Sequence, residues 1–202
     1  MPGKRRGEES ETPSRILDVA ERLVQARGFN GFSYADVAAV LGVTKASLHY
    51  HFASKAELGK ELISRYAARF AEALEAIDRS PADAHARLDA YASLYANVLS
   101  NQRMCLCGML AAEYETLPQP MRDVVLRFFD ENEAWLEAVI ERGKEEGTLD
   151  VAGSPKEAAR VIVSGLEGAM LVARPYGDVE RFQAAARTLL AIVAGPIPEP
   201  VS

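Results

Sequence analysis

The sequence predicts an all-α protein. Apolar residues recur at helical spacing in almost every segment, and no stretch shows the alternation of β-branched and polar residues that marks a strand. Ser, Thr and Asp residues stand where helices would begin, and Gly or Pro stands where they would end. About nine helices are expected in the 202 residues, without a sequence repeat.

The first helix is expected to start at Thr12-Pro13, because proline suits the first helical position, and to stop at Gly28. The spacing S-x-x-[DE], a capping box, predicts further starts at Ser33, Ser54, Ser80 and Ser154. From these starts and from the Gly and Pro stops we predict long helices over residues 55–79, 82–100 and 121–144.

The ends of the chain and its charge limit what it can be. Residues 1–12 are expected to form a disordered arm, with Lys4-Arg5-Arg6 as a solvated patch rather than a minor-groove contact, and residues 196–202 to form a frayed tail. No apolar run approaches the roughly 20 residues of a membrane span, and no secretory signal is present, so a cytoplasmic protein is expected. The net charge is −6, but residues 1–60 hold nine Lys/Arg against seven Asp/Glu. A basic head is compatible with DNA, because phosphates respond to the local field.

The segment 37–51 has the pattern of a helix-turn-helix. An apolar helix reaches Gly42, which permits a tight turn, and Thr44 then caps a second short helix. Leu48 and Phe52 would hold the inner face of that helix. Its outer face presents a cation, hydroxyls, an imidazole and a phenol, which suit base edges and phosphates.

The run G-F-N-G-F-S…D-V-A…L-G-V-T-K-A-S-L-H-Y-H-F-A-S-K-A-E-L, within residues 28–58, resembles the N-terminal domain of the TetR family of transcriptional regulators. The resemblance implies a DNA-binding domain at 13–55 and a helical ligand-binding and dimerisation domain at 56–195. It also implies a homodimer that binds a palindromic DNA operator, usually represses, and holds a small-molecule effector in its body.

By position in the resemblance, the recognition helix spans residues 45–51, and Lys45, Ala46 and His49 face bases. The remaining implied contacts are to phosphate or the groove wall: Thr44, Ser47, Tyr50, His51 and Lys55. The family usually has Tyr where this chain has His49, so the operator sequence is left open there. His49 and His51 diverge on a helix, so no metal or other cofactor is expected.

The body is rich in aromatic and methionine side chains, which make adaptable apolar walls. The resemblance implies that these helices surround a pocket, although periodicity alone also allows them to be filled core. The candidate ligand-binding residues are Tyr91, Tyr95, Cys105, Met109, Glu113, Tyr114, Phe128, Trp135 and Met170.

Cys105 and Cys107 are the only cysteines, and their i, i+2 spacing argues against a disulfide between them. The segment resembles that of electrophile- and oxidant-sensing TetR-type regulators, so Cys105 could serve a thiol-based sensor repressor. The alternative, which we favour, is that both cysteines are small buried apolar residues.

The last two helices carry broad apolar faces with small residues, and these would form a four-helix bundle with a second copy. Burial within one chain is the alternative. The candidate interface residues are Val161, Gly165, Gly168, Ala169, Phe182, Leu189, Leu190 and Val193.

An enzyme and a helical interaction module compete with a DNA-binding regulator. No nucleophile–base pair, metal motif or phosphate-binding loop supports catalysis, so an enzyme is not expected. An interaction module would not need the polar outer face of residues 45–50.

Overall fold

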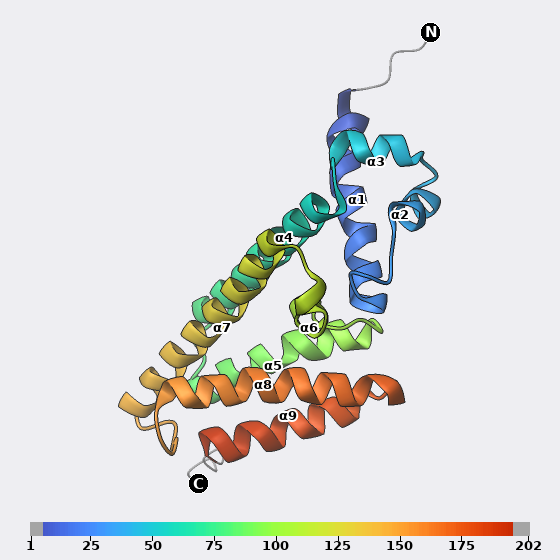
Figure 1. Cartoon of the computed structure of the whole chain (residues 1–202). Helices are drawn as coiled ribbons and strands as arrows, with labels where there is room; N and C mark the ends of the chain where they lie inside the picture. Colours follow the sequence, from blue (N-terminus) through green and yellow to red (C-terminus); the bar gives the residue numbers. More distant parts are fainter. Residues whose placement is uncertain (1–5, 196–202) are drawn as a thin grey trace. The chain divides into compact units, whose positions relative to one another are not determined.

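The computed structural model describes residues 6–195, which form helices and no strand (Figure 1). The expected all-α class is therefore confirmed for this part of the chain. The predicted disorder at 1–5 and fraying at 196–202 lie outside the described residues. The elements are α1 (Arg6–Arg27), α2 (Tyr34–Leu41), α3 (Lys45–His51), α4 (Lys55–Arg79), α5 (Ala84–Ser100), α6 (Leu106–Ala112), η1 (Tyr114–Thr116), α7 (Gln119–Glu145), α8 (Pro155–Ala173), η2 (Arg174–Tyr176) and α9 (Val179–Ala194).

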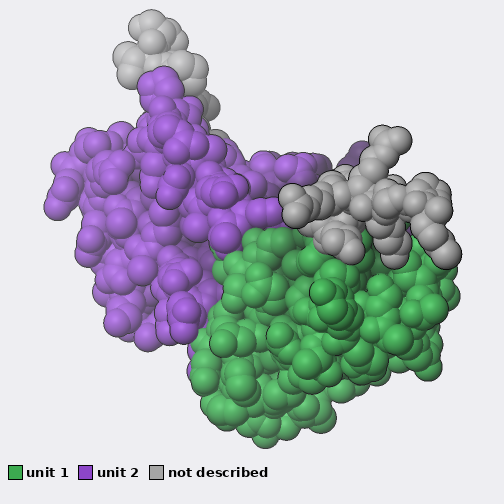
Figure 2. Space-filling model, turned by 90° about the horizontal axis from the view of Figure 1, so that it is seen from above, with its two compact units in different colours: residues 1–67, 106–125 green, residues 68–105, 126–202 purple. Residues whose placement is uncertain are grey.

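The chain divides into two compact units, which Figure 2 colours separately. The first takes in the described residues up to Ala67 together with Leu106–Val125. The second takes in Ala68–Cys105 together with the described residues from Leu126. The unit boundaries therefore fall inside α4 and α7, whereas the sequence placed a boundary between residues 55 and 56 and kept 106–125 in the body.

Two helix starts differ from the sequence prediction. α1 begins at Arg6 and holds Pro13 in its interior, so residues 6–12 are helical here rather than part of the arm. α5 begins at Ala84, and Asp83 is its N-cap because its carboxylate accepts a hydrogen bond from the Ala86 N–H at 2.8 Å. The predicted capping box at Ser80 is therefore wrong. The box at Ser33 is confirmed. Ser54 and Ser154 cap their helices by accepting from the N–H groups of Glu57 and Glu157.

Local signals build the helix-turn-helix of the first unit. Gly28 ends α1 at a φ of +82°, and its N–H donates to Val24 O. Ser33 and Asp36 form the capping box of α2, which ends at Gly42 with a φ of +67°. Thr44 then caps α3 by accepting from Ser47 N. The apolar inner faces of α1, α2 and α3 meet in a core that includes Ile16, Val24, Val37, Leu48 and Phe52.

In the second unit α8 and α9 lie side by side, and α5 contacts both of them (Figure 1). Two candidate interface residues, Phe182 and Leu190, are buried within this packing at 1% and 6% exposure, so they are core residues of the single chain. The sequence could not separate the buried stripe of α9 from its free face, because both are apolar. Leu189 packs on Gly165, where an added Cβ would lie 2.4 Å from a Leu189 methyl carbon.

The other candidate interface residues lie at or near the surface. Val161 and Gly168 are exposed, and Gly165, Ala169 and Val193 are half-buried. Within residues 6–195, none of the helices combines the length and apolar character needed to cross a membrane.

Candidate functional site

The outer face of α3 is open to solvent. Lys45, Ala46, His49 and Tyr50 are exposed, with Tyr50 at 86%. The helix is held from below by Leu48, which is fully buried, so these outer side chains are presented from a fixed backbone. Of the remaining predicted DNA contacts, Thr44 is exposed and Ser47 and His51 are half-buried.

His49 is oriented by two contacts within the first unit. Its ring lies against Tyr34 with centroids 4.7 Å apart, and its Nδ1 is 3.3 Å from the Ala53 carbonyl oxygen. A carbonyl only accepts, so this contact needs the hydrogen on Nδ1, and the neutral ring then offers Nε2 as an acceptor. Tyr34 is itself anchored, because its hydroxyl donates to Phe52 O at 2.9 Å. Such an imidazole is suited to accept a hydrogen bond from a base edge.

A groove beside α3 joins the recognition face to the start of α2. It is lined by Phe32, Ser33, Tyr34, Ala35, Lys45, His49 and Lys55.

Lys55 does not extend freely from the start of α4. Its Nζ donates to Phe29 O at 2.6 Å and to Phe32 O at 2.5 Å, and it lies over both aromatic rings at 4.5 and 4.4 Å from their centroids. Burial lowers the pKa of Lys55, and the Glu113 and Asp36 carboxylates oppose that shift. The lysine that the sequence assigned to phosphate therefore spends two of its three donors on the loop between α1 and α2.

Glu113 binds the same loop from the other side. Its carboxylate accepts from Phe29 N at 2.5 Å and from Asn30 N at 3.2 Å. The Asn30 side-chain amide also donates to Thr116 Oγ1 at 2.7 Å. Glu113 was predicted to bind ligand, but its carboxylate accepts hydrogen bonds from two backbone N–H groups of the loop that follows α1.

The backbone angle and the contact with Glu113 both require glycine at position 28. Its φ of +82° suits glycine, and an added Cβ would lie 2.7 Å from Glu113 Oε1. Gly28 was predicted from the sequence as a helix stop. The role of the carboxylate was not predicted, because Glu113 is 84 residues from Phe29 in the chain and no local pattern links them.

The second unit brings four of the predicted ligand residues into one aromatic cluster with Phe70. Tyr91 is stacked on Trp135 with centroids 5.6 Å apart, and Phe70 meets Tyr91, Tyr95 and Phe128 edge to face. Tyr91, Tyr95 and Phe128 are buried, and Trp135 is half-buried with its Nε1 donating to Asp78 at 2.9 Å.

The polar groups of this cluster form a directed chain. Tyr91 OH donates to Asn132 Oδ1 at 3.1 Å, so the Tyr95 OH must donate to Tyr91 across the 3.1 Å between their oxygens. Asn132 Nδ2 in turn donates to Phe128 O at 2.7 Å. Asn132 was not predicted, because asparagine within a helix is usually solvated.

Glu167 on α8 is the second residue that the sequence did not single out. Its Oε1 is buried and has no hydrogen-bond partner among the described residues. Burial raises the pKa of Glu167 to about 7, and a hydrogen bond with the Cys105 side chain opposes the shift. Cys105 is buried, and its backbone N–H is 3.2 Å from the Met170 sulfur, so these two predicted residues also adjoin this carboxyl group.

Met109 and Tyr114 belong to the first unit with Glu113. Both are half-buried, and the Tyr114 ring lies beneath the Arg122 guanidinium at 5.2 Å. The nine predicted ligand residues are therefore divided between the two units, and six of them gather in the second.

Two family descriptions account for most of the chain. Residues 16–62 match "Bacterial regulatory proteins, tetR family", and residues 84–189 match "Tetracyclin repressor-like, C-terminal domain". The chain belongs to the TetR family. It is a ligand-responsive, DNA-binding transcriptional regulator and not an enzyme.

Relatives span nearly the whole TetR chain. The transcriptional repressor NemR of Escherichia coli is 27% identical over 93% of this chain and 96% of its own, and DhaR of a Mycobacterium species is 26% identical over 80% and 83%. A solved TetR family regulator from Agrobacterium tumefaciens is 32% identical, covers 92% of this chain and 98% of its own, and has a TM-score of 0.88. The reduced form of E. coli NemR has a TM-score of 0.80 at 27% identity, over 92% of this chain and 98% of its own.

Glu113 and Lys55 together form a clamp on the loop between α1 and α2 of this TetR chain. The clamp predicts that replacing two left-handed glycines by alanine lowers the stability by unequal amounts. Gly28→Ala should lower the free energy of unfolding by about 1–2 kcal/mol for the backbone conformation, with a further loss for the contact with Glu113. Gly42→Ala is the matched control, because nothing lies within 4 Å of its added Cβ. Urea unfolding measures both, and equal losses at the two sites would contradict the clamp.

Glu167 predicts a specific pH dependence of stability. Its pKa is raised from 4.5 to about 7 by folding, so the folded chain binds more protons and loses stability as pH rises through that window. At about 1.4 kcal/mol per unit of pKa shift, the loss is about 3 kcal/mol by neutral pH. Glu167→Gln should remove this part of the slope in urea unfolding at several pH values, while Glu133→Gln keeps it. A Glu167→Gln profile parallel to the native one would contradict the prediction.

Proposed function

We propose that the protein acts as a homodimer that binds a palindromic DNA operator and is released when a small molecule binds the second unit. The observation that carries this is the exposed, polar outer face of α3 on a buried inner face. Lys45, Ala46 and His49 would read bases in the major groove, and Thr44, Ser47, Tyr50 and His51 would contact phosphates or the groove wall. Such a protein acts on the chromosome, in the cytoplasm.

We assign Lys55 a positioning role in addition to any phosphate contact. Its bonds to Phe29 O and Phe32 O fix the start of α4 against the loop that precedes α2. The position of α3 depends on that loop, because α2 packs on α1 and α3 packs on α2. One donor of the ammonium group is left for a phosphate oxygen.

A stripe on α8 supports the dimer. Val161, Gly168 and Val172 follow helical spacing along one face, and Val161 and Val172 are 48% and 56% exposed. A Cβ on Gly168 would meet nothing within 4 Å, so the single chain does not require glycine there. Glycine inside a helix lowers its stability by about 1 kcal/mol relative to alanine. Close approach of a second helix would explain why glycine is present at position 168. Paired with α9, which exposes Ile192, this face would form a four-helix bundle between two copies.

The effector would bind at the aromatic cluster of Tyr91, Tyr95, Phe128 and Trp135, with Cys105 and Met170 adjoining. α4 supplies Phe70 to that cluster and Lys55 to the loop between α1 and α2, so it is one element that can carry a change from one unit to the other. Ligand can shift the protein only by binding better to the state that is unable to hold DNA.

Thiol sensing by Cys105 is the alternative. Cys105 is 1% exposed and Cys107 is fully buried. A reagent must reach the sulfur to modify it, so burial favours the interpretation of both cysteines as core residues.

Selection of duplex DNA tests the proposed function. The protein should enrich a palindrome whose half-sites lie about one DNA turn apart, roughly 34–36 Å. His49→Ala should reduce the preference for that operator over random DNA by about tenfold, since a base contact is worth about 1–3 kcal/mol. Lys156→Ala, which removes an exposed lysine of α8, is the control and should bind as the native protein does. Equal losses on operator and random DNA would contradict the assignment of His49 to a base.

Oligomeric state tests the α8 stripe. Gly168→Arg should yield a folded monomer that no longer retains the operator, because the new side chain has room in the single chain but places a charge in the interface. Leu126→Arg is the control, since Leu126 is 50% exposed on α7, away from this stripe. Sedimentation velocity measures both variants. A dimeric Gly168→Arg protein would show that the interface lies elsewhere.

A further inference from the structure

The buried polar groups of the second unit differ in what they still offer a ligand. The donors of the cluster are engaged: Tyr95 OH with Tyr91, Tyr91 OH with Asn132, Asn132 Nδ2 with Phe128 O, and Trp135 Nε1 with Asp78. The Cys105 side chain hydrogen-bonds to Glu167 and opposes the rise of its pKa, which identifies the thiol as a donor to that carboxyl group. The donors that surround Glu167 are therefore already committed.

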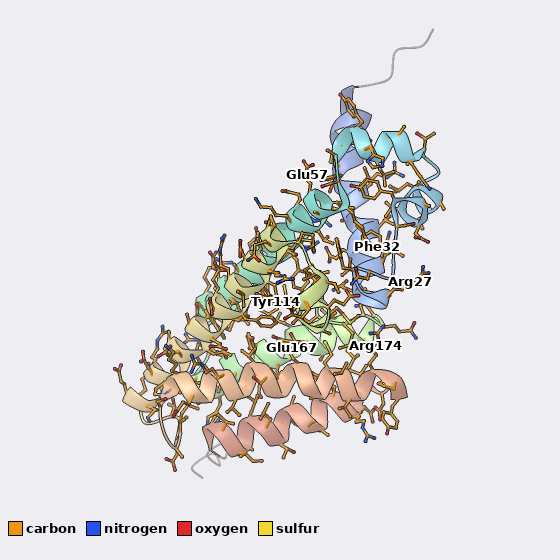
Figure 3. The ribbon with its side chains drawn as sticks, in the orientation of Figure 1. Arg27, Phe32, Glu57, Tyr114, Glu167 and Arg174 are labelled. Atoms are coloured by element: carbon orange, nitrogen blue, oxygen red, sulfur yellow. The ribbon has the colours of Figure 1, made fainter. Side chains whose placement is uncertain are left out.

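What remains in the cluster are acceptors. Glu167 Oε1 is buried without a partner, and the oxygen of Tyr95 keeps its acceptor capacity after donating its hydrogen to Tyr91. Glu167 lies on α8 on the side of α5, the helix that carries both tyrosines (Figure 3). Burial raises the pKa of Tyr91 and of Tyr95, and the Glu167 carboxylate adds to both shifts. A ligand that enters here must supply hydrogen-bond donors.

An ionised carboxylate in such a place needs a cation. A buried charge is costly without a partner, and no basic side chain contributes to the pKa shift of Glu167. Among the described residues, the side chains that act on the pKa values of this region are Cys105, Glu133, Glu167 and the two tyrosines, and none of these is a cation. The faces of Tyr91, Tyr95, Phe70 and Trp135 add the aromatic surface to which organic cations are attracted.

We propose that the effector is an organic amine in its protonated form, whose ammonium group donates to Glu167 while its apolar part packs among the aromatic rings. This rests on the proposed function, because it names the chemical class that the effector cluster takes. Glu167 is the residue that selects a positively charged effector. Met170, beside Cys105, is a flexible side chain that can move to admit the apolar part.

The test compares phenethylamine, cyclohexylamine and decylamine with the alcohols of the same carbon skeletons and with phenylpropanoate. Isothermal titration gives the affinities, and the fluorescence of Trp135, the single tryptophan, reports whether binding occurs at the cluster. At least one amine should bind, more tightly than its alcohol, and its affinity should rise about tenfold from pH 6 to pH 8 as a carboxyl group with a pKa of about 7 ionises.

Two variants complete the test. Glu167→Gln should weaken amine binding at pH 8 by at least about tenfold and abolish the pH dependence, since the amide keeps an acceptor but not the charge. Glu141→Gln, which removes an exposed carboxylate of α7, should leave both unchanged. Three results would overturn the proposal: no amine binds, the alcohol or the acid binds as tightly as the amine, or Glu167→Gln binds like the native protein.

Operator binding without any amine separates this inference from the proposed function. Native protein and Glu167→Gln should both retain the operator, because Glu167 takes no part in the recognition face. If the operator is retained and the amines fail, only the assignment of the effector falls. If the native protein does not distinguish operator from random DNA, the proposed function itself is wrong.

Discussion

The backbone of the loop between α1 and α2 must satisfy its hydrogen bonds, and two side chains from other parts of the chain do so. Glu113 accepts from the N–H groups of Phe29 and Asn30, and Lys55 donates to the carbonyls of Phe29 and Phe32. Unpaired backbone groups in a partly buried loop would cost free energy comparable to lost hydrogen bonds. The recognition helix depends on this loop, because the loop sets where α2 begins and α3 packs on α2.

The clamp also links the segment that begins with α6 to the DNA-binding unit. Residues 106–125 form one compact unit with the helix-turn-helix, and both Glu113 and Thr116 accept hydrogen bonds directly from its loop. A change that reaches this segment would therefore act on the recognition helix through a carboxylate and two backbone amides. This is a more local route than a movement of the whole body, and it uses no residue of the recognition face.

The second unit presents the opposite case, because it buries an acceptor, Glu167 Oε1, to which no described residue donates. Tyr95 donates to Tyr91, and Tyr91 donates to Asn132, so these hydroxyl donors are engaged within the cluster. Glu167 Oε1 remains unpaired among the described residues. Such a group lowers the stability of the empty protein. A regulator can tolerate that loss, since a bound donor recovers it and so couples binding to conformation.

The sequence by itself determined the helices and the recognition face, because caps, glycine stops and helical periodicity act over three or four residues. Ser33 with Asp36, Thr44 with Ser47, and Gly28 and Gly42 at their left-handed turns were all readable in the chain. Tertiary structure decided which apolar faces are covered, as at Phe182 and Leu190, and which distant polar groups meet, as at Lys55, Glu113 and Glu167. The reason is physical: a cap is a contact between near neighbours, whereas the partner of a buried charge is chosen by the packing of helices that lie far apart in the chain.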